Sequence, residues 1–585
     1  MSTETVAPVQ EAPAKAKLAA PPMTSAARPD FKAAQPTTTF AGSAIPPLQT
    51  GLPKLTQSLC PECKGAATIE ARLFEEEGKV WMEKTCSQHG YFRDLYYSDV
   101  KLYLKAEQWQ FGDGRGLMNP AVPEATRCPA DCGLCSMHTS HTGLANLDLT
   151  NRCNLTCPIC FANANTSGTL YEPSLEQVRG MLQALRDEKP VAGRIVQFSG
   201  GEPTLYPQFF EACSLARDMG FSHVQAATNG ILLADPDFAR QAKQAGLTTL
   251  YLQFDGLTDD VYLRTRGQRL AATKMQVIAN ARAVGMKIVL VPTIVRGLND
   301  QQIGDIMRLA VKNADVVTGL TFQPVTFTGR LNRNELAAKR FTQADVAHAI
   351  AEQSGYTDAY HDWFPLSCVQ PFSMLISALR GELTVHLSCH PHCSLGTYLF
   401  VDEATHEAVP ITRFVDIGAM LQDIYDLARQ TANSRIKLWS KLKIWSKLQK
   451  HFKPQFAPRG LDFQRFVQTL QGFTDKKLGR DGMDGKFTYR AILVSAMHFM
   501  DSYNYDVERV RRCVIHYAAP DGRIYPFCAY NSGPVFREQV EKQFSVPFDR
   551  EAEAGLAAGN GNGCGGCGAG KDAAAPPART APFKP

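Results

Sequence analysis

The chain has 585 residues and a net charge of +5, and this length predicts more than one domain. So small a net charge excludes a surface that attracts nucleic acid as a whole. The sequence has no signal-type N-terminal segment and no apolar run of the ~20 residues that a membrane helix needs, so we expect a cytoplasmic protein without a nucleic-acid partner.

Seventeen cysteines are present, and most of them stand in short clusters. A long intracellular chain keeps its thiols reduced, so these clusters predict metal ligands rather than disulfides. We expect residues 1–56, rich in Ala, Pro, Thr and Ser, to form a disordered tail.

Residues 57–95 carry two ligand pairs, Cys60 with Cys63 and Cys86 with His89, separated by β-rich sequence. This spacing predicts a metal ribbon in which each pair sits on one turn and a hairpin lies between them. The ligand set suits zinc. A mononuclear iron of rubredoxin type, with a fourth thiol in place of His89, is the alternative.

The next segment, 96–143, reads as a linker that contains the triplet Cys128, Cys132 and Cys135. We interpret the triplet as ligands of an auxiliary cluster whose fourth ligand comes from elsewhere. We expect His138 and His141 to be ordinary loop residues.

From 144 to 340 the pattern alternates strand and helix. It predicts parallel strands with right-handed crossovers, an α/β fold curled into a partial barrel of six β/α units. A helix should begin at the capping box Ser174 to Gln177. The expected strands are 144–150, 194–199, 222–228, 248–254, 287–293 and 316–322.

Directly after the first of these strands comes the triplet Cys153, Cys157 and Cys160. Three closely spaced thiolates can hold three irons of a cubane cluster and leave the fourth iron open. Unrelated thiols or part of a zinc site are the alternatives. Because the active sites of such barrels lie at the carboxyl ends of the strands, we expect the catalytic centre at this loop.

Residues 341–550 contain Cys368, Cys389, Cys393, Cys513 and Cys528. Thiols spread so widely suit iron–sulfur clusters that join distant segments. We expect two auxiliary clusters, and the sequence leaves open which cysteines belong to which cluster. Within this region, 435–453 is basic, bears two tryptophans and is amphipathic on a helical wheel. It could contact an anionic membrane face, or pack on the barrel with a solvated lysine face. Residues 551–585 read as a second disordered tail, with Cys564 and Cys567 in glycine-rich sequence.

The Cys153 triplet, followed one unit later by Gly-Gly-Glu-Pro, resembles the radical SAM superfamily. The resemblance implies a [4Fe–4S] cluster that binds S-adenosylmethionine (SAM) at its open iron, and a 5′-deoxyadenosyl radical that abstracts hydrogen from unactivated carbon. It also implies SAM contacts from the strand ends. These residues are Gly200, Gly201, Glu202, Pro203, Thr228, Asn229, Asp255 and Val295.

The ribbon, the paired triplets and the late Tyr-Pro-Phe-Cys528 are similar to one subgroup, which contains tetraether lipid synthase and the radical SAM methylases once described as methylene-tetrahydrofolate-dependent. This resemblance implies carbon–carbon bond formation on lipid alkyl chains, with a flavodoxin- or ferredoxin-type electron donor and a peripheral position at the inner membrane face. Two alternatives stay open: a radical SAM C-methylase acting on a pterin or another heterocycle, and a non-catalytic iron–sulfur electron carrier.

Overall fold

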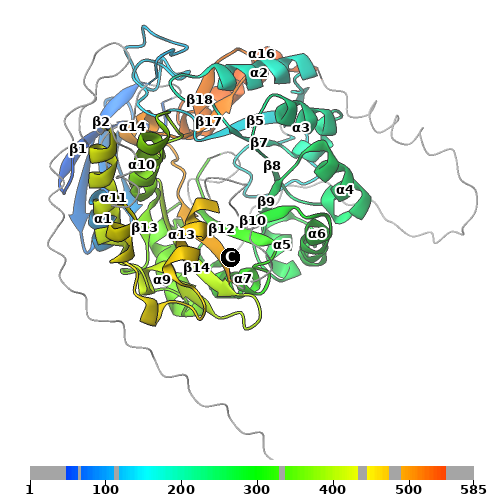
Figure 1. Ribbon diagram of the computed structural model, residues 1–585. Helices are drawn as coiled ribbons and strands as arrows, with labels where there is room; N and C mark the ends of the chain where they lie inside the picture. The colour runs from blue at the N-terminus through cyan, green and yellow to red at the C-terminus, as the bar shows by residue number, and fades with distance from the viewer. Residues whose placement is uncertain are drawn as a thin grey trace, which may run out of the picture.

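The structure is a computed structural model, and it describes residues 48–63, 67–110, 117–165, 167–328, 336–432, 444–472 and 489–547. Most of the two expected tails, residues 435–443 of the basic segment, and Cys564 and Cys567 lie outside these ranges. Figure 1 shows a ring of strands with helices on its outer side and a small separate sheet at one edge.

The small sheet is the predicted ribbon. Its four strands are antiparallel in the order β1-β2-β3-β4, and a short helix, α1, follows. One face of the sheet is buried in the core through Leu73, Val80 and Met82. The alternate residues face outward, as the two-residue period of a strand requires. The bounds are β1 Lys54–Leu59, β2 Thr68–Glu76, β3 Lys79–Cys86, β4 Gly90–Tyr97 and α1 Val100–Glu107.

The large sheet contains all six predicted strands, which are confirmed as parallel neighbours in the order β12-β10-β9-β8-β7-β5. Their apolar residues, such as Leu147, Phe198 and Leu250, are buried in the main core, and alternate positions such as Asn146 and Gln197 face the inside of the ring. The bounds are β5 Leu144–Thr150, β7 Ile195–Gly200, β8 His223–Thr228, β9 Thr249–Gln253, β10 Lys287–Val291 and β12 Val317–Pro324.

Crossover helices cover the outer face of this sheet (Figure 1). The predicted capping box is present: Ser174 accepts a hydrogen bond from the Gln177 amide, and the Gln177 side chain accepts one from Ser174 N. The helix that starts there buries Val178, Met181 and Leu182. The crossover helices are α2 Leu175–Asp187, α3 Phe209–Asp218, α4 Pro236–Ala245, α5 Asp259–Arg266, α6 Ala271–Val284, α7 Ile303–Lys312 and α9 Gln343–Ser354.

Two late strands extend the same sheet at its two sides, which the sequence did not predict. Strand β16 (Tyr489–Met497) runs parallel to β12, and β17 (Ile515–Ala518) runs parallel to β5. Antiparallel strands β14 (Ser394–Asp402) and β18 (Ile524–Pro526) then flank them. No pairing between β16 and β17 occurs in the described chain, so the barrel stays open, and the C-terminal region forms its missing wall.

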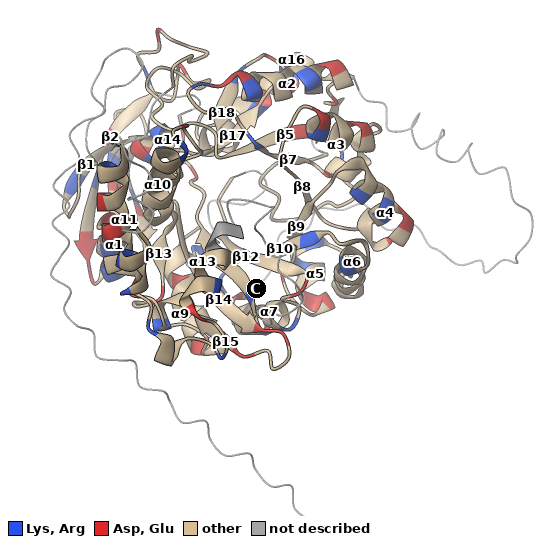
Figure 2. Ribbon diagram, viewed as in Figure 1, with Lys and Arg blue, Asp and Glu red and all other residues tan. Residues whose placement is uncertain are grey.

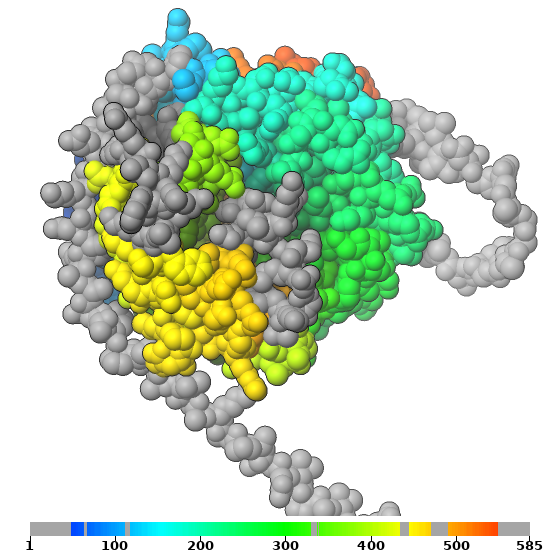
Figure 3. All heavy atoms as spheres, viewed as in Figure 1, coloured from blue at the N-terminus to red at the C-terminus, as the bar shows by residue number. Residues whose placement is uncertain are grey.

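A second core lies outside the barrel, between the helices of the C-terminal region. Helices α10 (Gln370–Arg380) and α11 (Ile417–Ala432) contact each other, and α13 (Phe463–Gly472) packs beside α11. Figure 3 shows α10 in yellow-green and the later residues of this part in yellow, over the left front of the ring.

The described part of the basic segment, residues 444–453, packs into this second core. Ile444, Leu448 and Phe452 contact its apolar residues. Lys447 and Lys450 form ion pairs with Asp423 of α11 at 3.4 and 2.8 Å. The described residues therefore favour packing on the protein over membrane contact, and no described helix has the length and apolarity that spanning a membrane would take.

Candidate functional site

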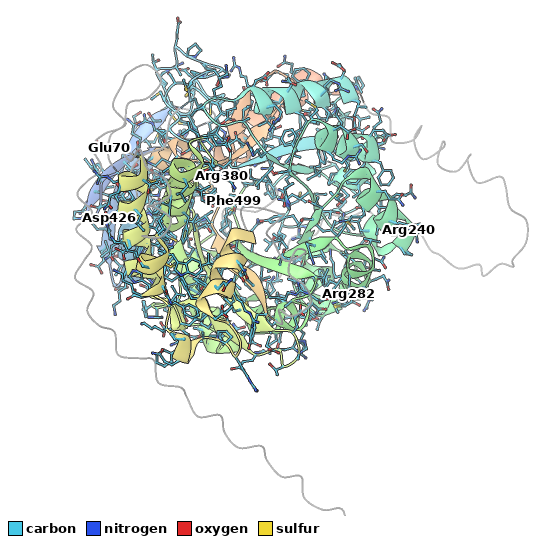
Figure 4. The ribbon with its side chains drawn as sticks, in the orientation of Figure 1. Glu70, Arg240, Arg282, Arg380, Asp426 and Phe499 are labelled. Atoms are coloured by element: carbon cyan, nitrogen blue, oxygen red, sulfur yellow. The ribbon has the colours of Figure 1, made fainter. Side chains whose placement is uncertain are left out.

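A cavity of about 340 Å³ lies inside the open barrel, and the predicted catalytic loop lines it. The three cysteines of the loop reach it together with the Gly-Gly-Glu turn and the end of β8. Of the sequence-predicted residues, the lining contains Cys153, Cys157, Cys160, Gly200, Gly201, Glu202, Thr228 and Asn229. Figure 2 shows most charged residues on the outer helices, and Figure 4 places Phe499 toward the inside of the ring and Arg240 and Arg282 on its outer side.

The cysteine loop is held in shape by one asparagine. Asn165, with φ of 66°, accepts a hydrogen bond from Cys153 N at 3.0 Å and donates to Cys153 O at 2.7 Å. All three thiols pack with Leu155 in one small cluster of side chains. Burial raises the pKa of Cys153 to about 12, so a thiolate at this position calls for a cation such as a metal centre.

The Gly-Gly-Glu turn lies directly against this loop. Gly201 N donates to Thr150 O at 2.7 Å, and Glu202 N donates to Arg152 O at 2.8 Å. A Cβ at Gly201 would stand 2.1 Å from Arg152 O, and one at Gly200 would stand 2.2 Å from Thr150 O. Only glycine permits so close an approach between the two loops.

Glu202 joins the ends of two strands. Its carboxylate is buried and accepts hydrogen bonds from Thr204 Oγ1 at 2.6 Å, Thr228 Oγ1 at 2.7 Å and Asn229 N at 2.8 Å. Burial raises the pKa of Glu202, and these donors oppose that rise. Asn229 in turn donates to Asn154 of the cysteine loop at 2.7 Å. The motifs that were separate in sequence therefore form one connected rim.

Three of the predicted cofactor contacts do not line the cavity. Pro203 opens a turn of 3-10 helix, and Val295 packs in an apolar cluster with Ile159. Asp255 is fully buried behind Arg266, which donates to it through Nε at 2.5 Å and Nη2 at 2.9 Å. The Asp255 carboxylate therefore holds Arg266 in place rather than facing the cavity itself. Arg266 lines the cavity and interacts with Cys157 Sγ.

Two further site residues are Arg266, to which the sequence assigned no role, and Lys274, which sequence reasoning missed. Lys274 is fully buried and donates to Gln253 Oε1 at 2.9 Å and to the carbonyl oxygen of Asn229. Burial lowers its pKa to about 7. Arg266 follows Asp255 closely in the sequence, so a search for cations near the polar strand ends could have found it. Lys274 reads as an ordinary helix residue and gave no signal.

The deeper part of the cavity has two unlike sides. Side-chain amides lie along the strands: Gln197 donates to Asn146 Oδ1 at 2.7 Å, and Gln323 donates to the Tyr251 hydroxyl at 2.9 Å. The C-terminal region supplies an apolar side, led by Phe499 and Phe527, whose rings stack at 3.9 Å.

A second cavity, of about 40 Å³, adjoins the first and is lined by four of the predicted ligands: Cys389, Cys393, Cys513 and Cys528. Cys528, Phe499 and Phe527 line both cavities. Four thiols around one apolar space are the donor set of a [4Fe–4S] cluster, so these residues fit such a group.

The first triplet forms a separate group. The sulfur atoms of Cys128, Cys132 and Cys135 interact with one another, and Cys513 is the next thiol that interacts with Cys132. All three are buried, and neither cavity includes them. Cys368 packs against Trp109 and Leu421 and does not line the second cavity, although it interacts electrostatically with Cys389.

His138 and His141, expected to be ordinary loop residues, are buried. His138 Nε2 lies 2.9 Å from Cys513 O and 3.1 Å from His516 Nε2. His141 accepts a hydrogen bond from His386 N at 2.9 Å. These contacts fasten the linker to the C-terminal region, which the sequence alone did not indicate.

The ribbon brings its four predicted ligands together. The ligand atoms of Cys60, Cys63, Cys86 and His89 all lie within 4.8 Å of one another. The sulfur atoms of Cys63 and Cys86 are 3.8 Å apart, about the separation that two ligands of a tetrahedral zinc ion have when each Zn–S bond is ~2.3 Å.

Comparison with known proteins gives two family matches. Residues 147–310 match the radical SAM superfamily, and residues 52–98 match the HMPTM N-terminal zinc ribbon domain. The ribbon prediction is confirmed at the level of this domain.

Several relatives are similar to the chain. The 7,8-dihydro-6-hydroxymethylpterin dimethyltransferase of Methanocaldococcus jannaschii is 43% identical over 504 residues, which is 85% of this chain and 96% of that protein. The Fe-coproporphyrin III synthase of Methanosarcina barkeri is 29% identical over 31% of this chain and 44% of its own length. The solved structure of Streptococcus suis SuiB bound to S-adenosylmethionine covers 37% of this chain and 48% of its own, with 16% identity and a TM-score of 0.31.

These matches correct one expectation. The relative that matches along nearly its whole length is named for a pterin, not for tetraether lipid synthesis, so the alternative of a methylase gains support and the lipid interpretation gains none from the comparisons.

Proposed function

This chain belongs to the radical SAM enzyme family that includes the 7,8-dihydro-6-hydroxymethylpterin dimethyltransferase of Methanocaldococcus jannaschii, and from this membership we propose that it methylates carbon atoms of a reduced pterin or a closely similar heterocycle. The observation that carries the proposal is identity of 43% across 96% of that relative. The similarity covers 85% of this chain, far more than residues 147–310 that match the radical SAM superfamily.

Cys153, Cys157 and Cys160 would hold the catalytic [4Fe–4S] cluster. When bound, this cluster supplies the electron that splits SAM into methionine and a 5′-deoxyadenosyl radical, which removes hydrogen from an unactivated carbon. The backbone of Gly200 and Gly201 would border SAM, and the rim of Glu202, Thr228 and Asn229 would fix the loops around it. Arg266, held by Asp255, keeps a fixed positive charge beside Cys157.

The substrate would occupy the deeper part of the cavity. Amide side chains such as Asn146, Gln197 and Gln323 both donate and accept hydrogen bonds, as the edge of a pterin ring requires. Phe499 and Phe527 offer an aromatic side on which a flat ring can stack.

The remaining metal positions are proposals as well. Cys389, Cys393, Cys513 and Cys528 would hold one auxiliary cluster, the Cys128 triplet would hold another with a fourth ligand from outside it, and the ribbon ligands would hold zinc. A flavodoxin- or ferredoxin-type protein would deliver the electron.

One observation favours a second candidate, the functionalisation of an alkyl chain. The cavity is lined mainly by apolar groups, and only Glu202, Arg266 and Arg537 among its lining residues are charged. The two acids nearest these arginines, Asp255 and Asp148, are paired with them rather than free to bind a pterin. A long apolar substrate would fill such a space without unpaired polar groups.

The test uses the reconstituted full-length protein with SAM, a one-electron reductant and 7,8-dihydro-6-hydroxymethylpterin. For each methyl group added to the pterin, we expect one SAM to give methionine and 5′-deoxyadenosine and a second SAM to donate the methyl group and leave as S-adenosylhomocysteine, with two electrons taken from the reductant. The Cys157→Ala variant should form none of these products. In parallel, lipids are compared between a deletion strain and strains complemented with the wild type or Cys157→Ala.

Methylated pterin with unchanged lipids supports the first proposal. If the deletion strain instead loses lipid species that only the wild-type gene restores, while no pterin is methylated, the alkyl-chain proposal replaces the pterin proposal. Failure to form 5′-deoxyadenosine with a full cluster content would contradict both and favour an electron carrier.

A further inference from the structure

The second cavity contains a buried cation with no carboxylate partner. Arg509 lines this cavity beside the four cysteines and is 3% exposed. Its Nη2 donates to His498 O at 2.5 Å, while its Nε has no hydrogen-bond partner among the described residues. The sulfur atoms of Cys393 and Cys528 are among its electrostatic partners.

Two other buried arginines of the described chain are paired with acids. Arg340 contacts Asp94 and Asp501, and Arg537 contacts Asp148. No such ion pair involves Arg509 within the described residues. A buried charge without a counterion is strongly unfavourable, so the thiolates around the cavity are the anions that this guanidinium has to pair with.

His498 adds a second unpaired polar group. It lines the same cavity, is 2% exposed, and its Nε2 has no partner among the described residues. Its main-chain amide donates to Cys393 O at 3.2 Å, which fixes it next to this ligand. Arg509 Nε and His498 Nε2 are thus two buried polar groups that face four thiols. An iron–sulfur cluster in this space would give them sulfur atoms as hydrogen-bond acceptors.

We propose that Arg509 is a positioning residue that raises the reduction potential of the auxiliary cluster held by Cys389, Cys393, Cys513 and Cys528. The inference rests on the proposed assignment of that cluster. Adding one electron to a cluster with four thiolates adds one negative charge. A fixed positive charge in a site of low dielectric stabilises the reduced form more than the oxidised form. Hydrogen bonds to the ligand sulfurs act in the same direction.

Arg511 provides a matched control. It stands two residues further along the chain and interacts with Cys128 of the other thiol group, but it is paired with Glu508 at 2.9 Å. Removing its charge should affect the potential of the other centre and leave the Cys389 group unchanged.

The experiment is a redox titration followed by electron paramagnetic resonance on the full chain, in a Cys153, Cys157 and Cys160→Ala background, so that only auxiliary signals remain. Arg509→Gln should lower the equilibrium constant for reduction of one signal about tenfold, which is about 59 mV for a one-electron couple. Arg509→Lys, which keeps the charge, should restore most of that loss, and Arg511→Gln should leave this signal in place.

The readout needs no substrate, so it is independent of the methylation proposal. If neither auxiliary signal is lost in the Cys389→Ala, Cys393→Ala double variant, the cluster assignment is overturned. A signal that depends on these cysteines, with iron content and midpoint unchanged in Arg509→Gln, would overturn the role of Arg509. Equal shifts in the Gln and Lys variants would overturn the role of its charge.

Discussion

At the scale of single residues, the site depends on how closely two loops approach. Gly200 and Gly201 bring the turn after β7 against the backbone that precedes Cys153. The cysteine loop and the turn are therefore one structural unit, and a single added methyl group would separate them.

We predict that Gly201→Ala reduces both iron content and SAM cleavage by at least tenfold. The new Cβ would lie 2.1 Å from Arg152 O, so the cysteine loop would have to move. Iron analysis and 5′-deoxyadenosine formation measure the effect. Gly180→Ala is the control, because that glycine lies in α2 with nothing within 4 Å of an added Cβ and alanine suits a helix. Full cluster content and cleavage in Gly201→Ala would refute the close-approach argument.

A second residue-scale prediction concerns Glu188, at the end of α2. It is 6% exposed and accepts hydrogen bonds from Thr142 N at 2.6 Å and Thr142 Oγ1 at 2.5 Å. Burial raises its pKa to about 7, against 4.5 for a free glutamate. The folded protein therefore binds more protons than the unfolded chain between these values, and stability falls as pH rises through that window.

Glu188→Gln cannot ionise, so its melting temperature should exceed that of the wild type by a margin that grows from about pH 5 to about pH 7 and stays constant above it. Differential scanning fluorimetry measures this margin. Glu176→Gln on the same helix serves as the control, because its side chain is 85% exposed and should show no such trend. A margin for Glu188→Gln that does not change between about pH 5 and about pH 7 would contradict a raised pKa.

At the scale of elements, the sequence predicted the parts whose partners are close along the chain. The six strands, the capping box and the ribbon ligands follow from local pattern and spacing. Strand β16 was missed as a barrel strand, although its apolar run is visible, because it pairs with β12 across more than 160 residues. Local sequence does not encode which strand lies beside which.

The division of the cysteines was undecidable for the same reason. Cys389 and Cys513 meet only because the C-terminal region folds back over the open side of the barrel. Arg509 was also missed, because a run of arginines before Cys513 reads as a solvated surface. Its burial depends on the tertiary fold, as does the packing of Cys368 against Trp109 and Leu421.

An element-scale prediction concerns the ribbon. Its metal ligands stand at the ends of β1 and β3, where the cysteines pack with Phe92 and Ile69 in a small cluster apart from the main core. We predict that Cys63→Ser loses one equivalent of metal and speeds hydrogen exchange in β2 and β3, because a structural metal contributes directly to folding. Exchange in β7 and β8 should be unchanged. Equal acceleration in both sheets would show that the ribbon does not lose its structure separately.

At the scale of the whole molecule, one arginine connects three parts of the fold. Arg340, before α9, donates to Asp94 of the ribbon strand β4 at 2.6 Å and to Asp501 of the C-terminal region at 2.5 Å. All three side chains are buried. The ribbon is therefore fixed to the barrel through a buried ion-pair network, and removing Arg340 would break both of its ion pairs at once.

We predict that Arg340→Met destabilises the protein by about 3–5 kcal/mol, because it leaves two buried carboxylates without their cation. Arg282→Met, which breaks an exposed pair with Asp315 on the outer side of the ring (Figure 4), should cost less than ~1 kcal/mol. Chemical denaturation of both variants measures the difference. Similar losses in the two would show that the buried contact is not a main support of the fold.

The wall shared by the two cavities has a practical consequence. Cys528, Phe499 and Phe527 line both cavities. A molecule that binds in the larger cavity against these residues therefore contacts side chains that also border the smaller one. Magnetic spectra of the proposed C-terminal cluster would then register occupancy before any chemistry takes place. Candidate substrates could be screened by line shape alone, with an enzyme kept inactive by leaving SAM out.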